Sequence, residues 1–131
     1  MNLTKIMQDK ERAKSILKMV KLIEERIKLQ DKEKMAALIL SDYYEIIKEL
    51  LTALLLLDGY KTLSHKDLID YVDQNYKKFT KYEISFMHDI RVMRNKIVYE
   101  GLFADTSYLK RNNFLIKKII EKLKDLIKKK L

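Results

Sequence analysis

Apolar residues recur along the chain at the three-to-four-residue spacing of amphipathic α-helices, and they do so in five separate segments. Only two glycines and no proline interrupt the sequence. Long helices joined by short turns pack antiparallel. We therefore predict an all-α protein, an up-and-down bundle of four main helices plus one short helix, within a single domain at residues 1–131. The predicted helices run from Thr4 to about Leu29, from Asp31 to just before Gly59, from Ser64, from Thr80 to Gly101 and from Thr106 to Leu131.

Several of these boundaries carry local signals. Ser64 with Asp67, and Thr80 with Glu83, have the spacing of a capping box at a helix N-terminus. Gly59 and Gly101 suit the left-handed conformation that commonly ends helices. The residues expected to face the core are Tyr43, Ile47, Leu50, Leu54 and Leu57 in the second helix, Tyr82, Phe86, Ile90, Met93 and Ile97 in the fourth, and Ile116, Ile120, Leu123 and Ile127 in the fifth.

The sequence also limits the cellular setting. The longest apolar run, Leu50–Leu57, is far shorter than the roughly 20 residues that cross a membrane. Charges are spread among the apolar residues at the N-terminus, unlike in a signal peptide. The absence of cysteine excludes disulfides and thiolate chemistry. We expect a cytoplasmic protein with no membrane partner.

The net charge of +9 favours polyanionic partners such as RNA, DNA or an acidic protein. An alternative is that the many lysines simply solvate helix faces, as they do in other lysine-rich helical proteins. Common enzyme signatures are missing: there is no glycine-rich phosphate loop, no nucleophile elbow and no histidine pair at metal-ligand spacing. We expect no cofactor and no metal. Of the two histidines, His65 falls in the first turn of the short helix, where we expect it to be exposed.

Polar residues that could take part in binding or catalysis cluster near the end of the fourth predicted helix. His88, Arg91, Asn95 and Tyr99 fall on one helical face, and Arg94 lies between that face and the apolar stripe. Arginine offers a planar fork of donors that suits phosphate, and tyrosine offers a hydroxyl and a stacking surface. The candidate nucleic-acid-binding residues are Arg91, Arg94 and Lys96. Alternatively, Arg94 forms an ion pair with acids of the second helix, which presents Asp42, Glu45 and Glu49 on one face.

The stretch from Arg94 to Tyr99 resembles the signature of the HEPN family, in which Arg, usually followed by a polar residue such as Asn, is separated from a His by four to six intervening residues. The likeness extends upstream through Ser41–Glu45, Asp58–Tyr60 and Leu63–Leu68, so that it covers roughly residues 35–101. The resemblance implies a helical bundle that forms a homodimer, with the two motif helices lining a shared cleft. It also implies RNA as the substrate class and a metal-independent ribonuclease in which Arg and His promote attack of a ribose 2′-hydroxyl on the adjacent phosphate.

Many members of that family are toxins paired with a nucleotidyltransferase-like antitoxin, whereas others only bind. The sequence departs from the motif at its His position, which holds Tyr99. An unperturbed phenol, with a pKa of about 10, is a poor base at neutral pH, so cleavage would be weakened or lost. The resemblance makes Arg94, Asn95 and Tyr99 the catalytic candidates. His88, Asp42 and Glu45 are candidates for supporting roles, and His88 could substitute for the missing His.

Three functional hypotheses follow. The first is an RNA-directed HEPN-like protein, in its catalytic form a ribonuclease toxin, and the second is a non-catalytic module that binds RNA, a nucleotide or a nucleotidyltransferase partner. The third is a structural helical protein in which Arg94 only bridges to acids. Arg94 and Tyr99 project about 140° apart on a regular helix, so we expect them to converge only if the helix ends near Tyr99 or if two subunits face each other.

Overall fold

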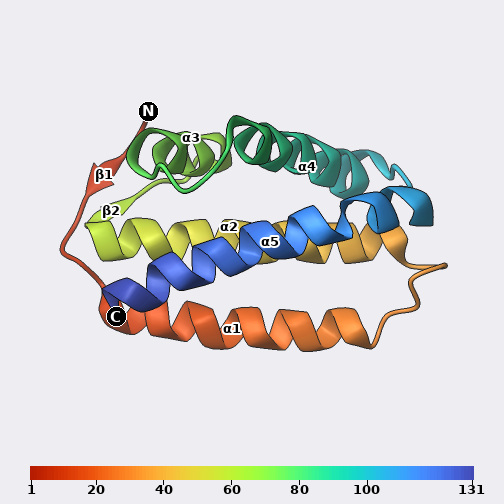
Figure 1. The fold of residues 1–131 in the computed structure, drawn as a ribbon, viewed down its shortest axis with the longest axis horizontal. Helices are drawn as coiled ribbons and strands as arrows, with labels where there is room; N and C mark the ends of the chain where they lie inside the picture. The colour runs from red at the N-terminus through yellow and green to blue at the C-terminus, as the bar shows by residue number, and fades with distance from the viewer.

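The computed structural model describes residues 1–131 and confirms the all-α bundle. Its helices are α1 (Lys10–Lys28), α2 (Ala36–Asp58), α3 (His65–Asn75), α4 (Lys81–Glu100) and α5 (Thr106–Lys130). Successive long helices run in alternating directions, so both chain termini lie at the same end of the bundle (Figure 1). Helix α5 packs across α2. No helix combines the length and the apolar character that crossing a membrane requires.

The first two predicted helices both begin later than expected. Residues Thr4–Lys5 form a strand, β1, that pairs antiparallel with β2 at Tyr60–Lys61. The Asp9 side chain then accepts a hydrogen bond from the Arg12 backbone and caps α1. Before α2, the Asp31 carboxylate accepts hydrogen bonds from the Glu33 and Lys34 amides and holds a turn. A polar side chain that bonds nearby amides competes with the helix, which explains both late starts.

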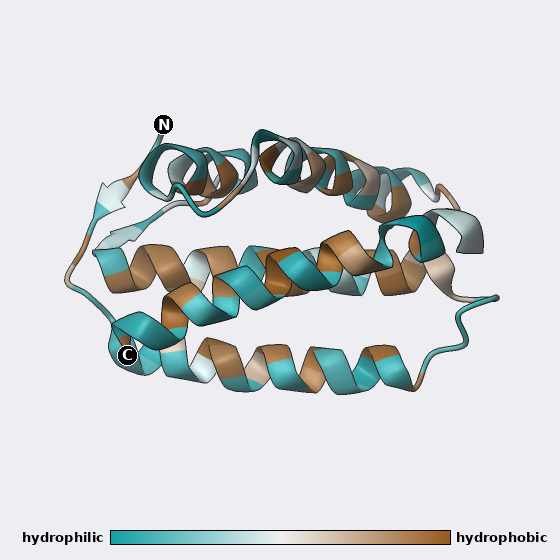
Figure 2. Cartoon of the chain, in the orientation of Figure 1, coloured by the Kyte–Doolittle hydropathy of each residue, from teal (hydrophilic) through white to brown (hydrophobic).

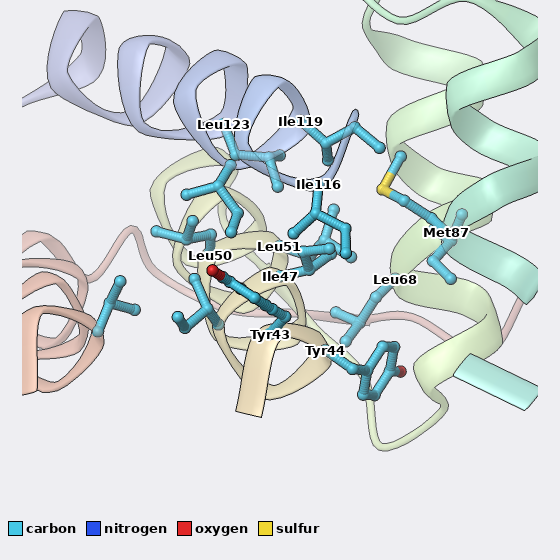
Figure 3. Packing of buried hydrophobic residues seen from close by; sticks show 14 of the residues in the cluster. Tyr43, Tyr44, Ile47, Leu50, Leu51, Leu68, Met87, Ile116, Ile119 and Leu123 are labelled. Carbon is cyan, nitrogen blue, oxygen red and sulfur yellow. The ribbon is translucent and has the colours of Figure 1, made fainter. Parts of the chain in front are cut away.

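Helix α2 forms the centre of the molecule. It packs against α1, α3, α4 and α5, and it is apolar on most of its circumference (Figure 2). In Figure 3, Ile47, Leu50 and Leu51 of α2 meet Leu68 of α3, Met87 of α4 and side chains of α5. The expected stripes of α2 and α5 are buried as predicted.

The core-facing stripe of α4 differs from the prediction at its start. Tyr82 is 68% exposed, whereas Glu83, Ile84 and Met87 are buried together with Phe86 and Ile90. The capping box between Thr80 and Glu83 is present, and it turns Glu83 inward, where Lys122 of α5 donates to its carboxylate at 2.7 Å. The buried ion pair sets the rotation of the first turn and leaves Tyr82 at the surface.

The C-terminal end of α2 is tied to α3 and α5 through one carboxylate. Asp58 accepts hydrogen bonds from Tyr71 at 2.8 Å, from Tyr76 at 2.5 Å and from Lys130 at 2.6 Å. Partial burial by itself would raise the pKa of Asp58, but the bonds from Lys130, Tyr76 and Tyr71 together hold it below its usual value. Gly59 follows at φ +86°, the left-handed conformation that ends α2.

The Asp58 contacts predict how acid affects stability. Because the pKa of Asp58 is lowered in the folded state, its contribution is present above about pH 4 and is lost as the pH falls through the folded pKa. We expect Asp58→Asn to lower the free energy of unfolding by about 1–3 kcal/mol at pH 7 and by less at pH 3. Urea denaturation at the two pH values measures this, and an equal loss at both would contradict the assignment.

Candidate functional site

The candidate site lies where the second half of α4 passes the first half of α2 and the start of α3. We call it the Arg94 cluster, and it consists of Tyr44, Glu45, Lys48, His65, Arg91, Arg94, Asn95 and Tyr99. Three helices contribute to it because α2 packs on both α3 and α4. A separate cavity of about 290 Å³ lies between α1 and α5. Its apolar lining consists of Ile27, Tyr43 and Ile120, and no residue of the Arg94 cluster lines it.

Arg94 is a largely enclosed cation of α4. Its side chain is 18% exposed, and its Nε is buried without a hydrogen-bond partner. The guanidinium carbon lies 5.9 Å from the ring centre of Tyr44 and 5.9 Å from that of Tyr99, in the range of cation–π contacts. Its Nη1 donates to Oδ1 of the neighbouring Asn95 at 3.3 Å. Arg94 and Tyr99 therefore converge within one subunit, and α4 ends at Glu100, one residue after Tyr99, which is the first of the two conditions expected for their convergence.

The nearest carboxylate to Arg94 is Glu45, but the pair is loose. Nη2 of Arg94 lies 3.9 Å from Oε2 of Glu45, beyond hydrogen-bond distance. The other oxygen of Glu45 accepts a hydrogen bond from Lys48 at 2.6 Å, and Lys48 also lies 3.1 Å from Glu49. Burial works against the charge of Lys48, but its bonds to Glu45 and Glu49 outweigh burial and raise its pKa. Glu45 and Glu49 are thus paired with a lysine of their own helix rather than with Arg94.

Arg91 lies one turn before Arg94 and has no acid of its own. Its side chain is half-buried, its Nε is buried without a partner, and its guanidinium makes no hydrogen bond or ion pair with the protein. Two guanidiniums three residues apart share one face of a helix. The two Nε atoms are buried, so the donors open to a ligand are the Nη groups of Arg91 and Nη2 of Arg94, which make no hydrogen bond within the bundle.

His65 begins α3 and lies against the same cluster. Its ring centre is 6.0 Å from that of Tyr44, on which Arg94 also packs. It is half-buried, which corrects the expectation that it is simply exposed. Burial and the positive charges of Lys48, Arg94 and Arg91 lower the pKa of His65, against a smaller opposing effect of Glu45. Burial also raises the pKa of Tyr44 to about 12, so that its hydroxyl stays protonated at neutral pH.

Two of the sequence-predicted residues make contacts outside the cluster. Asp42 accepts hydrogen bonds from Arg26 and Gln30 and joins α2 to α1. His88 lies 3.1 Å from a carboxylate oxygen of Asp70 on α3, and that same carboxylate binds Lys66. Lys96 is exposed and Tyr99 is 75% exposed. The structure thus groups Arg91, Arg94, Asn95, Tyr99 and Glu45, while Asp42 and His88 are held elsewhere.

Sequence patterns did not single out Tyr44, Lys48 or His65 as site residues. Lys48 lies on the same α2 face as Glu45, and Tyr44 is adjacent to Glu45 in the sequence. The α2 face proposed for Glu45 was therefore the signal that could have identified both. His65 carried no such signal. Its place depends on how α3 docks on α2 and α4, which helical periodicity does not specify.

The loose Arg94–Glu45 pair predicts a small cost for removing the guanidinium. We expect Arg94→Met to lower the free energy of unfolding by about 1 kcal/mol or less, because Lys48 still neutralises Glu45. The matched comparison is Lys122→Met, which leaves Glu83 buried at 2% exposure without its cation and should cost about 3 kcal/mol. Urea denaturation checks both. A loss of several kcal/mol for Arg94→Met would instead show that Arg94 serves the fold.

Comparisons of the chain with models of protein families, with curated proteins and with solved structures found no match.

Proposed function

We propose that this chain is a HEPN-like, RNA-directed protein that holds the RNA backbone at the Arg94 cluster. The observation that carries the proposal is the pair Arg91 and Arg94, whose guanidiniums have no hydrogen-bonded carboxylate within the bundle. A phosphodiester supplies the acceptor oxygens that such donors lack, and arginine forks match phosphate geometry. The net charge of +9 supports attraction of the same ligand from a distance.

The neighbours of the two arginines suit a nucleotide. Tyr99 is largely exposed and can stack on a base, as aromatic side chains do in proteins that bind single strands. The Asn95 amide accepts from Arg94 through its oxygen, which leaves its amide protons available to a ribose or phosphate oxygen. Lys96 adds a mobile positive charge at the surface. RNA is favoured as the ligand by the likeness of Arg94–Tyr99 to the HEPN motif.

Cleavage is the stronger form of the proposal. In a metal-independent ribonuclease, positioned guanidiniums stabilise the charge that develops on the phosphate when the 2′-hydroxyl attacks it. Arg91 and Arg94 have the charge and the half-buried setting for this role, in which electrostatic stabilisation is stronger than in water. As a toxin, the protein would be silenced by a nucleotidyltransferase-like antitoxin. As a non-catalytic module, it would bind RNA at the same residues.

The RNA-binding proposal is tested with a labelled single-stranded RNA by fluorescence anisotropy at several salt concentrations. We expect Arg91→Ala combined with Arg94→Ala to weaken binding at least about tenfold and to lower the salt dependence by about one unit of slope, because phosphate contacts are lost. Lys18→Ala combined with Lys21→Ala removes the same charge from an exposed part of α1 and is the control. If both double variants weaken RNA binding equally, the binding is a non-specific attraction to positive charge, and the proposal is contradicted.

We further propose that a second copy of the chain covers an apolar patch one turn beyond Arg94. The patch surrounds a cavity of about 230 Å³ between the C-terminal end of α4 and the start of α2. Its apolar members are Met35, Ala37, Leu38, Ile97, Leu102 and Phe103. Phe103 is 86% exposed and Leu38 is 56% exposed, and clustered apolar exposure of this kind is typical of interaction surfaces. A homodimer through this patch would bring the two copies of α4 near each other.

The dimer proposal predicts that the protein sediments as a dimer at micromolar concentration. Leu38→Ser combined with Phe103→Ser should shift it to a monomer without loss of helical circular dichroism, because both side chains are exposed in one subunit. Phe114→Ser alters a phenylalanine on α5 that is 80% exposed and should leave the dimer intact. Analytical ultracentrifugation distinguishes these outcomes, and a strictly monomeric wild-type protein would refute the proposal.

A further inference from the structure

His65 is the one residue of the Arg94 cluster whose side chain ordinarily changes charge near neutral pH. It falls in the wider likeness at Leu63–Leu68 but is not part of the Arg94–Tyr99 motif, in which the His position is taken by Tyr99. We propose that His65, brought from α3, is the residue that accepts the proton of the attacking ribose 2′-hydroxyl. The inference rests on the proposed RNA-directed function and assigns a further residue to the same site.

The first argument is position. His65 is the first residue of α3, directly after the cap residue Ser64, whose hydroxyl accepts a hydrogen bond from the Asp67 amide. In Figure 3 the ring of Tyr44 projects from α2 toward the helices α3 and α4. His65 packs near this ring at 6.0 Å between ring centres, and the guanidinium of Arg94 lies 5.9 Å from it. One aromatic side chain therefore holds the imidazole and the phosphate-binding cation in the same neighbourhood.

The second argument is that the imidazole is unused. Neither ring nitrogen of His65 makes a hydrogen bond within the protein, and neither is buried without a partner, so both remain open to a ligand. The other histidine, His88, is already paired with Asp70 at 3.1 Å. A base must reach the proton that it removes; both ring nitrogens of His65 are unpaired and the ring lies beside Arg94, whereas Nε2 of His88 is held by Asp70 outside the cluster.

The surroundings of His65 favour its neutral form. The groups that face His65 are Tyr44, Glu45 and Lys48 from α2, together with Arg91 and Arg94 from α4. Burial and then the cations among them favour the neutral imidazole, which lowers the pKa of His65. A neutral imidazole at pH 7 can accept a proton. The same cations that bind phosphate thus keep the base unprotonated until it acts.

A ring nitrogen of His65 takes the 2′-hydroxyl proton while the 2′-oxygen forms a bond to phosphorus and the bond from phosphorus to the 5′-oxygen breaks. The 5′-oxygen takes a proton from water, and the imidazolium of His65 neutralises the hydroxide that remains. The products are a 2′,3′-cyclic phosphate and a 5′-hydroxyl. Arg91 and Arg94 offset the added negative charge on the phosphate oxygens, and no metal ion takes part in the proton transfer.

The test compares His65→Gln with His88→Gln, since the chain has only these two histidines. Cleavage of a single-stranded RNA is measured in EDTA, and binding is measured separately with the same sequence carrying 2′-O-methyl groups, which cannot be cleaved by this route. We expect His65→Gln to slow cleavage at least about 100-fold with binding unchanged, and His88→Gln to cleave close to the wild-type rate. The wild-type rate should rise with pH, with a midpoint below the ordinary histidine pKa of about 6.5, and then level, with no such rise in His65→Gln.

The inference is overturned if His65→Gln cleaves as fast as the wild-type protein, if it loses binding of the methylated RNA, or if the wild-type protein leaves RNA intact. These failures are separate from that of the proposed function. If the wild-type protein does not bind the methylated RNA, the RNA-directed function itself is wrong. If it binds but never cleaves, the function as a binding module stands and His65 has no catalytic role.

Discussion

Burial of α2 on nearly every side is the constraint on which the other features depend. A central helix can carry few charges, and each must find a partner because an unpaired buried charge is costly. Asp42 is met by α1, Asp58 by Lys130 and two tyrosines, and Glu45 by Lys48 of α2 itself. The last pairing has a consequence for α4: since Lys48 occupies Glu45, Arg94 is left with a carboxylate at 3.9 Å and no close bond. The unfilled donors of the site thus arise from how the core helix neutralises its own acids.

The helical architecture followed from the sequence because period, caps and stop signals agreed. The stripes of α2 and α5 and the capping box at Thr80 were predicted from spacing alone. The errors occurred where a polar side chain or a distant strand competes with the helix. Asp9 and Asp31 hold local turns, and Thr4–Lys5 pairs with residues more than fifty positions away. Glu83 points inward because Lys122 of α5 donates a hydrogen bond to it. The pattern of α4 alone does not reveal this partner.

The candidate site was only partly predictable for the same reason. Residues on a single helix face, such as Arg91, Arg94 and Asn95, can be grouped from sequence, and the acid most available to Arg94 was among those proposed. Whether Arg94 is paired depends on a second helix, and the position of His65 depends on a third. Arg94 and Tyr99 were expected to meet within one subunit if the helix ended near Tyr99, and α4 ends one residue later. A long, flexible arginine reaches a ring one and a half turns away.

The N-terminal strand links the start of the chain to the site. The amide of Asn2 donates to the carboxylate of Asp67 at 2.8 Å, and β1 pairs with the two residues that lead toward α3. The segment that carries His65 is therefore anchored between the end of α2 and this short ribbon. Small, exposed ribbons open more readily than packed helices do. When the first five residues detach, the imidazole of His65 should lose its position in the same opening event. The rate of hydrogen exchange at β1 would then measure how often the site around His65 is disrupted.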